Sequence, residues 1–158
     1  MVTPLDDDVV RTHLSKGLGF SKADRDLHVL RVGSVASEVV RQNGVSICAL
    51  ISPYEDARNR VRAMFEPNRF LLIHVATPID VCQQRDVKGL YARAYTGELK
   101  GVTGVDDPYE PPTSPDIVLT TTDCTADECA VRIERLLEAR GILALPTDAV
   151  VVADGDYL

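Results

Sequence analysis

Short apolar runs alternate along this chain with segments that have the periodicity of helices. The runs VSICALI (45–51), FLLIHVA (70–76) and IVLTT (117–121) contain no Asp, Glu, Lys or Arg. Uninterrupted apolar runs of this length are typical of parallel strands that are buried on both faces. A shorter strand is expected at residues 2–6, directly before a run of aspartates. The alternation predicts an α/β fold in which helices cover both faces of a parallel sheet.

The helical segments carry start and stop signals. Ser21, with Asp24 three residues later, predicts a helix that ends at Asn43-Gly44. Thr77 is expected to cap another helix that has Pro78 at its first position. Further helices are expected at residues 9–16, from Pro53 to about Phe65, and from the capping box of Thr125 and Glu128 to about Arg140-Gly141.

The length of 158 residues is that of one domain. We expect residues 1–141 to form this domain and residues 142–158 to be a tail, whose strand-like patch AVVVA (149–153) has no assigned place. The net charge of −7 and the pI near 4.9 argue against nucleic-acid binding, which needs a basic face. Local arginines can still bind a small anion on an acidic protein.

The cysteines and the hydropathy pattern indicate the cellular setting. Cys48, Cys82, Cys124 and Cys129 form no CxxC pair, and no histidine stands at a zinc-finger spacing. Reduced thiols in a cytoplasmic protein are therefore expected. No signal-peptide pattern opens the chain, and no apolar run approaches the ~20 residues of a membrane helix, so no membrane contact is expected.

Polar residues follow the expected strands where a ligand would bind. In parallel α/β sheets, ligands sit beyond the carboxyl ends of the strands. Residues 6–8, Ser52-Pro53 and Thr77-Pro78 lie at three of these ends, so we expect them to converge on one crevice. The stretch 88–115 is rich in Gly, Pro and Asp, and long segments of this kind are often active-site lids.

Four segments match sequence patterns of one known family. LDDDVVRTHLSKGLGFSKADRD (5–26) resembles LDGDxVRxxLxxxLGFSxxDR, and ISPY (51–54) resembles an ISPY/ISPF strand end. TPIDVCQQRDVKGLYARA (77–94) resembles TPLEVCxxRDxKGLYxKA, and GELKGVTGVDDPYEPP (97–112) resembles the lid pattern GEIKxFTGIDxPYExP. All four patterns are those of adenylyl-sulfate kinases, and the resemblance spans about residues 2–140. It implies a P-loop kinase-like fold and a sulfate-assimilation enzyme that uses magnesium ATP to phosphorylate the 3′-hydroxyl of adenosine 5′-phosphosulfate (APS), giving PAPS.

The resemblance also implies a catalytic group. Asp8, together with Asp6, matches positions that orient the ribose hydroxyl and accept its proton, or that hold magnesium through water. Lys88 stands where the family lid brings a lysine towards the nucleotides. The alternative for the aspartates is an acidic helix start that favours the helix dipole. The alternative for Lys88 is an exposed basic residue.

The same resemblance implies the substrate-binding residues. Arg11 and Arg25 match arginines that grip the phosphosulfate end of APS, which suits the planar guanidinium fork. Phe20 matches an aromatic residue that stacks on the APS adenine, although it could instead plug the space between helices. The other matched substrate positions are His28, Ile51, Ser52 and Val102, and Arg85 matches a position near the ATP adenine.

The sequence departs from the family pattern on the ATP side. The family opens with a strand, a GxxGxGKxT phosphate loop and a helix, whereas no GxxxxGK[ST] occurs in these 158 residues. We therefore expect a kinase-like sheet that lacks its first strand–P-loop–helix, two strands with unpaired edges, and little turnover by this chain alone.

Smaller departures fall on the APS side. Asp7 replaces the Gly of LDGD, His28 an Asn, Val102 the lid Phe, Tyr95 an Arg and Ala76 an Asp. Together they suggest relaxed constraint. Two alternatives to an active kinase follow: a catalytically inactive APS/PAPS-binding module that regulates a partner such as an ATP sulfurylase, and the product of a truncated gene. A homodimer is also expected from the family.

Overall fold

The computed structural model describes residues 1–143, which form four strands and six helices in alternating order. The strands are β1 (Val2–Asp6), β2 (Val45–Ala49), β3 (Ile73–Val75) and β4 (Ile117–Leu119). The helices are α1 (Asp7–Thr12), α2 (Lys22–Arg41), α3 (Glu55–Arg62), α4 (Ile79–Arg85), α5 (Leu90–Tyr95) and α6 (Ala126–Ala139). This order confirms the predicted α/β class.

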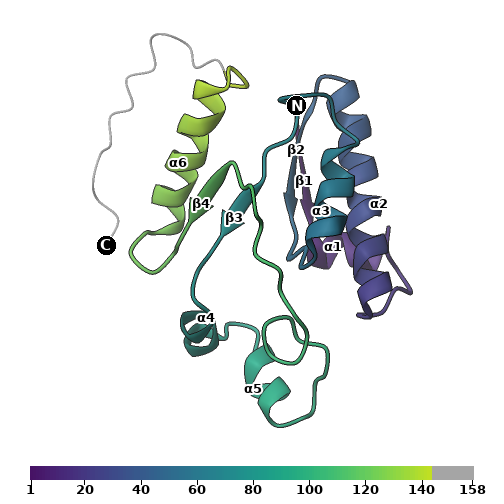
Figure 1. Cartoon of the computed structure of the whole chain (residues 1–158), viewed down its shortest axis with the longest axis vertical. Coiled ribbons are helices and arrows are strands. Elements are labelled where there is room, and N and C mark those ends of the chain that lie inside the picture. The colour runs from purple at the N-terminus through teal and green to yellow at the C-terminus, as the bar shows by residue number, and fades with distance from the viewer. Residues whose placement is uncertain (144–158) are drawn as a thin grey trace.

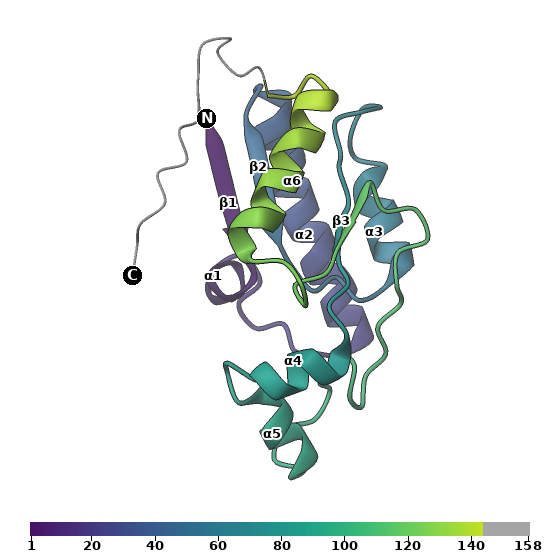
Figure 2. The same cartoon turned by 90° about the vertical axis from the view of Figure 1, so that its left-hand side faces the viewer.

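The strands form two parallel pairs. β1 pairs with β2 in the register Val2↔Val45, and β3 pairs with β4 in the register Ile73↔Ile117. Within residues 1–143 no ladder joins β2 to β3, so the sheet is in two parts. Figure 1 shows α2 and α3 beside the β1–β2 pair and α6 beside the β3–β4 pair. Both views place α1, α4 and α5 beyond the carboxyl ends of the strands (Figure 1, Figure 2).

The prediction that β2 and β3 are buried was wrong. Ile47 in β2 is 58% exposed and Val75 in β3 is 59% exposed. The physical reason is that, in the described part of the chain, β2 pairs only with β1 and β3 only with β4, so each has one edge without a strand neighbour. The edge of β2 away from β1 and the edge of β3 away from β4 therefore have no strand partner among residues 1–143, and apolar side chains on these strands are exposed.

The core lies between α2 and α3. Val29 of α2 packs with Ala57 and Val61 of α3, and all three are buried. The helices approach closely at Gly33, where an added Cβ would lie 2.7 Å from a methyl carbon of Val61. This packing fixes the start of α2, which carries site residues, relative to the end of β2.

The local helix signals were mostly confirmed. The hydroxyl of Ser21 accepts from the Asp24 amide at 3.2 Å, and the Thr125–Glu128 capping box is formed. The helix expected at 9–16 runs from Asp7 to Thr12, because Asp6 caps it two residues earlier. The helix expected from Pro53 begins at Glu55 with Tyr54 as its N-cap.

The predicted cap at Thr77 was wrong. Pro78 occupies the N-cap position of α4 and makes no side-chain cap bond. The Thr77 hydroxyl lies 2.8 Å from the Thr121 hydroxyl and accepts from the Thr121 amide at 3.0 Å. It therefore ties the end of β3 to the end of β4, a tertiary bond that competes with the local cap.

The stretch 88–115 contains α5 and otherwise turns and extended segments. The patch AVVVA (149–153), and the expected tail from residue 144 onwards, lie outside the described residues. Among residues 1–143, no helix combines the length and apolar character needed to cross a membrane.

Candidate active site

Two aspartates at the carboxyl end of β1, Asp6 and Asp8, make different contacts. Asp6 Oδ1 accepts from the amides of Asp8 at 3.1 Å and Val9 at 3.3 Å, so this carboxylate caps α1. Asp8 forms an ion pair with Lys88 Nζ, and the two side chains are 73% and 63% exposed. The hydrogen bond that Lys88 donates to Asp8, the charge of Asp8, and the nearby charges of Asp6 and Asp7 raise the pKa of Lys88. Thus the sequence-predicted Asp8 and Lys88 meet, and both remain open to a ligand.

An aromatic ring between two arginines lies at the start of α2. The guanidinium carbon of Arg11 lies 4.8 Å, and that of Arg25 5.4 Å, from the centroid of the Phe20 ring. Phe20 is 58% exposed, so it does not fill a gap between helices. An exposed ring beside two cations provides a stacking surface and positive charge at one place.

Arg25 connects this cluster to the lid segment. Its side chain is buried, with Nε donating to the Phe20 carbonyl at 2.9 Å and lying 3.2 Å from Asp107 Oδ2. Nη1 donates to Thr103 Oγ1 at 3.0 Å, and Nη2 donates to the Gly101 carbonyl. Arg25 therefore holds segment 101–107 against the start of α2.

A second set of bonds holds the lid to the corner between β2 and α3. Tyr54 donates to Asp107 Oδ2 at 3.2 Å, and the Glu110 amide donates to the Pro53 carbonyl at 2.8 Å. The buried Arg58 donates to the Glu110 carbonyl at 2.6 Å. Sequence reasoning missed Arg58 and Asp107, because each looks like an ordinary charged residue until the lid is folded against α3.

Glu55 completes the lid attachment. It accepts from the Thr113 hydroxyl at 2.7 Å and pairs with Arg58. The hydrogen bond from Thr113, followed by that from Arg58, lowers the pKa of Glu55 to about 2. The carboxylate thus stays ionised and keeps both partners across the ordinary pH range.

The residues at the end of β2 lie beside this attachment. Ile51 is 55% exposed. Ser52 adopts a φ of +43°, and its carbonyl accepts from Arg58 Nη1 at 2.6 Å. In the lid, the Val102 amide donates to Asp106 Oδ1 at 2.7 Å, and a Cβ on the preceding Gly101 would lie 4.0 Å from the Phe20 Cβ. The lid therefore passes beside Phe20 at Gly101, the residue before Val102.

His28 is placed differently from the other predicted residues. Its ring is only 2% exposed. Nδ1 lies 2.7 Å from Ser15 Oγ, and Nε2 lies 2.7 Å from Asp7 Oδ1. Burial, and then the nearby charge of Arg11, lower the pKa of His28. The ring lies behind Arg11 and presents little surface to a ligand.

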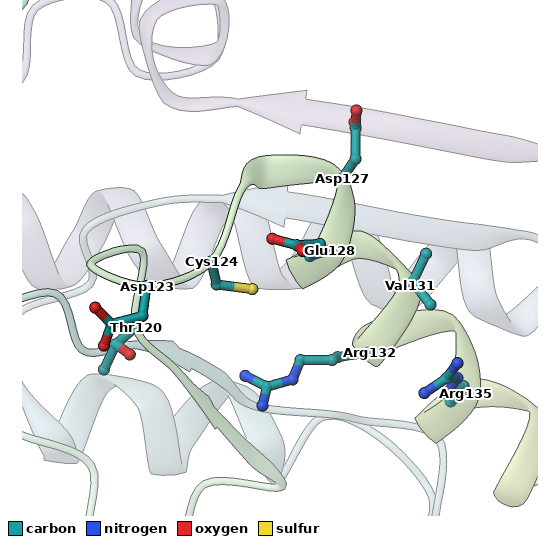
Figure 3. A pocket seen from close by; sticks show the side chains of 8 residues that line it. All are labelled: Thr120, Asp123, Cys124, Asp127, Glu128, Val131, Arg132 and Arg135. Atoms are coloured by element: carbon teal, nitrogen blue, oxygen red, sulfur yellow. The ribbon is translucent and has the colours of Figure 1, made fainter. Parts of the chain in front are cut away.

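Arg85 forms part of a separate group at the ends of β3 and β4. Its Nη1 donates to Thr121 Oγ1 and its Nη2 to the Thr121 carbonyl, both at 2.6 Å. It lines a hollow of about 570 Å³ together with the loop that precedes α6. A neighbouring hollow of about 600 Å³ is lined by the 8 side chains in Figure 3: Thr120, Asp123, Cys124, Asp127, Glu128, Val131, Arg132 and Arg135.

The described residues supply no preformed metal cage. In residues 1–143, no group of three or more His, Cys, Asp or Glu side chains is arranged to hold an ion. The four cysteines form no disulfide with one another in the structure.

Parallel strands with acids and arginines gathered beyond their carboxyl ends define an α/β protein with a ligand site at that edge, and the likeness to solved kinases reported below places the fold in the P-loop kinase-like class. The known proteins that resemble the chain agree. The family model described as adenylylsulphate kinase matches residues 1–120. The adenylyl-sulfate kinase of Rippkaea orientalis is 47% identical over 142 residues, covering 90% of this chain and 77% of that protein.

Solved structures show the same likeness. The APS kinase of Mycobacterium tuberculosis, in complex with AMPPNP and APS, matches with a TM-score of 0.81 and 36% identity, covering 87% of this chain and 80% of that one. The hexameric APS kinase of Thiobacillus denitrificans matches with a TM-score of 0.68 and 41% identity, covering 92% of this chain and 24% of that one. The chain belongs to the adenylylsulphate kinase family.

Proposed function

We propose that this chain is an adenylyl-sulfate kinase that transfers the γ-phosphoryl group of ATP to the 3′-hydroxyl of APS. The observation that carries the proposal is the Arg11–Phe20–Arg25 cluster, over which the lid is bound by Arg25. An adenine with an anionic phosphosulfate needs an aromatic surface and guanidinium groups together. The Asp8–Lys88 ion pair links the start of α1 to the segment after α4. This pair supplies the groups that act on the 3′-hydroxyl and on the transferring phosphoryl group.

The reaction requires positioning and charge neutralisation more than covalent chemistry. The 3′-oxygen of APS bonds to the γ-phosphorus, the bond from that phosphorus to ADP breaks, and the hydroxyl proton passes to the Asp8 carboxylate. Lys88 stays protonated beside Asp8 and neutralises charge on the transferring group. Asp6 positions Asp8 through the α1 cap. Magnesium enters with ATP as part of the co-substrate, with Asp8 able to contact it through water.

Binding of the ATP phosphates requires a phosphate-binding loop. The 158 residues contain no GxxxxGK[ST] loop, and β2 and β3 each lack a second neighbour in the described part. We place a parallel strand in this position, followed by a phosphate loop and a helix, supplied by a segment outside these residues in the same or another polypeptide. Arg85 and the hollow before α6 then face the ATP base.

Phosphate transfer from γ-labelled magnesium ATP to APS tests both the role of Asp8 and the need for an added phosphate loop. We expect little labelled PAPS from the 158 residues alone. We expect a clear signal when the strand–loop–helix of a relative is joined ahead of Met1, and its loss in Asp8→Ala. Labelled PAPS that is insensitive to Asp8→Ala would contradict the role of Asp8. A rate from the 158 residues equal to that of a complete relative would contradict the need for the added segment.

The inactive binding module and the gene fragment are not favoured, since relatives at 42–47% identity across most of the chain carry the kinase name. Association with an ATP sulfurylase and with a second copy of the chain stay predictions. Sedimentation of the purified protein, alone and with a sulfurylase, measures both.

A further inference from the structure

Two departures from the family pattern lie against each other in the structure. Asp7 stands where the pattern LDGD has Gly, and His28 stands where Asn is expected. They come from different helices, α1 and α2, yet His28 Nε2 lies 2.7 Å from Asp7 Oδ1. The two departures are therefore in direct contact, so a change at one position alters the surroundings of the other.

The contact extends to a residue of the APS-side cluster. The same oxygen, Asp7 Oδ1, accepts from Arg11 Nε at 3.1 Å, and a carboxylate oxygen has lone pairs for two donors. The Arg11 guanidinium in turn lies 4.8 Å from the Phe20 centroid. Asp7 therefore stands between the buried histidine and the arginine beside the Phe20 ring.

Burial makes the two residues interdependent. His28 is 2% exposed, and Ser15, whose hydroxyl lies 2.7 Å from His28 Nδ1, is 1% exposed. His28 Nε2 is a buried atom whose geometry forms no full hydrogen bond, and the Asp7 carboxylate is the polar group 2.7 Å from it. Gly at position 7 would remove that carboxylate and leave the buried nitrogen with less polar compensation. With Asn at position 28, the shorter side chain would leave Asp7 attached to Arg11 alone. Gly at position 7 together with Asn at position 28 would leave neither a buried histidine without the carboxylate nor a carboxylate without the histidine.

We propose that Asp7 and His28 are a compensating pair of positioning residues that orients Arg11 beside Phe20 and thereby sets the affinity for the phosphosulfate of APS. This inference rests on the proposed function. The Ser15 hydroxyl lies 2.7 Å from His28 Nδ1, and His28 Nε2 lies 2.7 Å from Asp7 Oδ1. Asp7 in turn accepts from Nε of Arg11, whose Nη1 donates to the Gly19 carbonyl at 3.5 Å. The pair replaces Gly and Asn as a unit and keeps the anion-binding arginine in place.

A double-mutant cycle on the full chain tests the pair. The affinity for APS is measured by calorimetry for the parent, Asp7→Gly, His28→Asn and the double variant. We expect each single variant to bind about tenfold more weakly and the double variant to recover to within about threefold of the parent, as strongly coupled neighbours do. A double variant weakened by the product of the single effects would overturn the proposal.

A stability cycle on the same four proteins separates positioning from mere folding. Single variants that unfold more easily but retain the parent affinity would overturn the positioning role. If the parent itself does not bind APS, the proposed function fails, and so does the link from the pair to affinity. If the parent binds but the cycle is additive, only the inference fails.

Glu38 and Arg41 provide a matched control on α2. They form an ion pair whose side chains are 63% and 61% exposed, in the last turns of α2 and remote in the helix from Arg25. Glu38→Gln, Arg41→Gln and their combination are expected to leave the APS affinity unchanged. Coupling in this cycle as large as that of Asp7 and His28 would overturn the assignment of the effect to the pair.

Discussion

Lys88 Nζ forms an ion pair with the carboxylate of Asp8, although the two residues are 80 positions apart in the sequence. The pair joins the end of β1 to the turn between α4 and α5. Since both side chains remain largely exposed, the contact leaves them available to a ligand, and the predictions below begin with it.

Asp8→Asn is expected to lower phosphate transfer by about 100-fold or more, because a positioned general base contributes about 10²–10⁴-fold. The free energy of unfolding should change by less than about 0.5 kcal/mol, as for other exposed positions. The rate is measured on the chain carrying an added phosphate-loop segment. Asp56→Asn is the control, since Asp56 is 74% exposed and forms an ion pair with Arg60 of the same helix. Equal rates for the two variants would contradict a catalytic role for Asp8.

Arg25→Ala is expected to release the lid. The change removes a buried guanidinium that contacts Phe20, Gly101, Thr103 and Asp107. Losing one partner of a buried charge pair costs about 3 kcal/mol or more. Limited proteolysis measures the release as faster cleavage within 97–112. Arg41→Ala, at an exposed position, is the control, and an unchanged cleavage rate for Arg25→Ala would show that other contacts hold the lid.

Val102→Phe is expected to tighten APS binding. The lid passes beside Phe20, since a Cβ on Gly101 would lie 4.0 Å from the Phe20 Cβ. A second aromatic surface for the adenine is worth about 1–3 kcal/mol, or about 5- to 150-fold in the dissociation constant. Calorimetric titration with APS measures the change. Val87→Phe, at a position that is 92% exposed, should have no effect, and equal gains at both positions would point to nonspecific binding.

The stability of the protein is expected to fall as the pH drops below 6.5, in part through His28. Burial and Arg11 hold the pKa of the folded-state ring below its ordinary value of 6.5, while Asp7 opposes this and Arg31 adds to it. The unfolded chain therefore binds more protons in the window between the folded pKa and 6.5, so this contribution is intact above pH 6.5 and is lost below it.

Urea unfolding between pH 5 and pH 8 measures this dependence. His28→Asn should show a shallower loss of stability than the parent below pH 6.5. His74→Asn is the matched comparison, because burial and Arg58 lower the pKa of His74 as well. If His28→Asn leaves the slope unchanged while His74→Asn removes it, the His28 prediction is wrong.

The sequence by itself determined the features that depend on near neighbours. The Ser21 cap, the Thr125–Glu128 capping box and the strand at 2–6 were all predictable, because their bonds or patterns span only a few residues. The motif around Arg11, Phe20 and Arg25 also pointed to residues that lie together, since the three share one short segment and both guanidinium groups lie within 5.4 Å of the Phe20 ring.

Only the tertiary structure decided which distant groups meet. Thr77 had the sequence of a helix cap, but its hydroxyl bonds to Thr121 instead. The burial of β2 depended on a neighbouring strand that its own apolar residues do not reveal. The pairing of Asp7 with His28, like the lid bonds of Arg25, appears when α1, α2 and the lid pack together. Such contacts depend on how whole helices, strands and loops pack together, and a short stretch of sequence does not determine that packing.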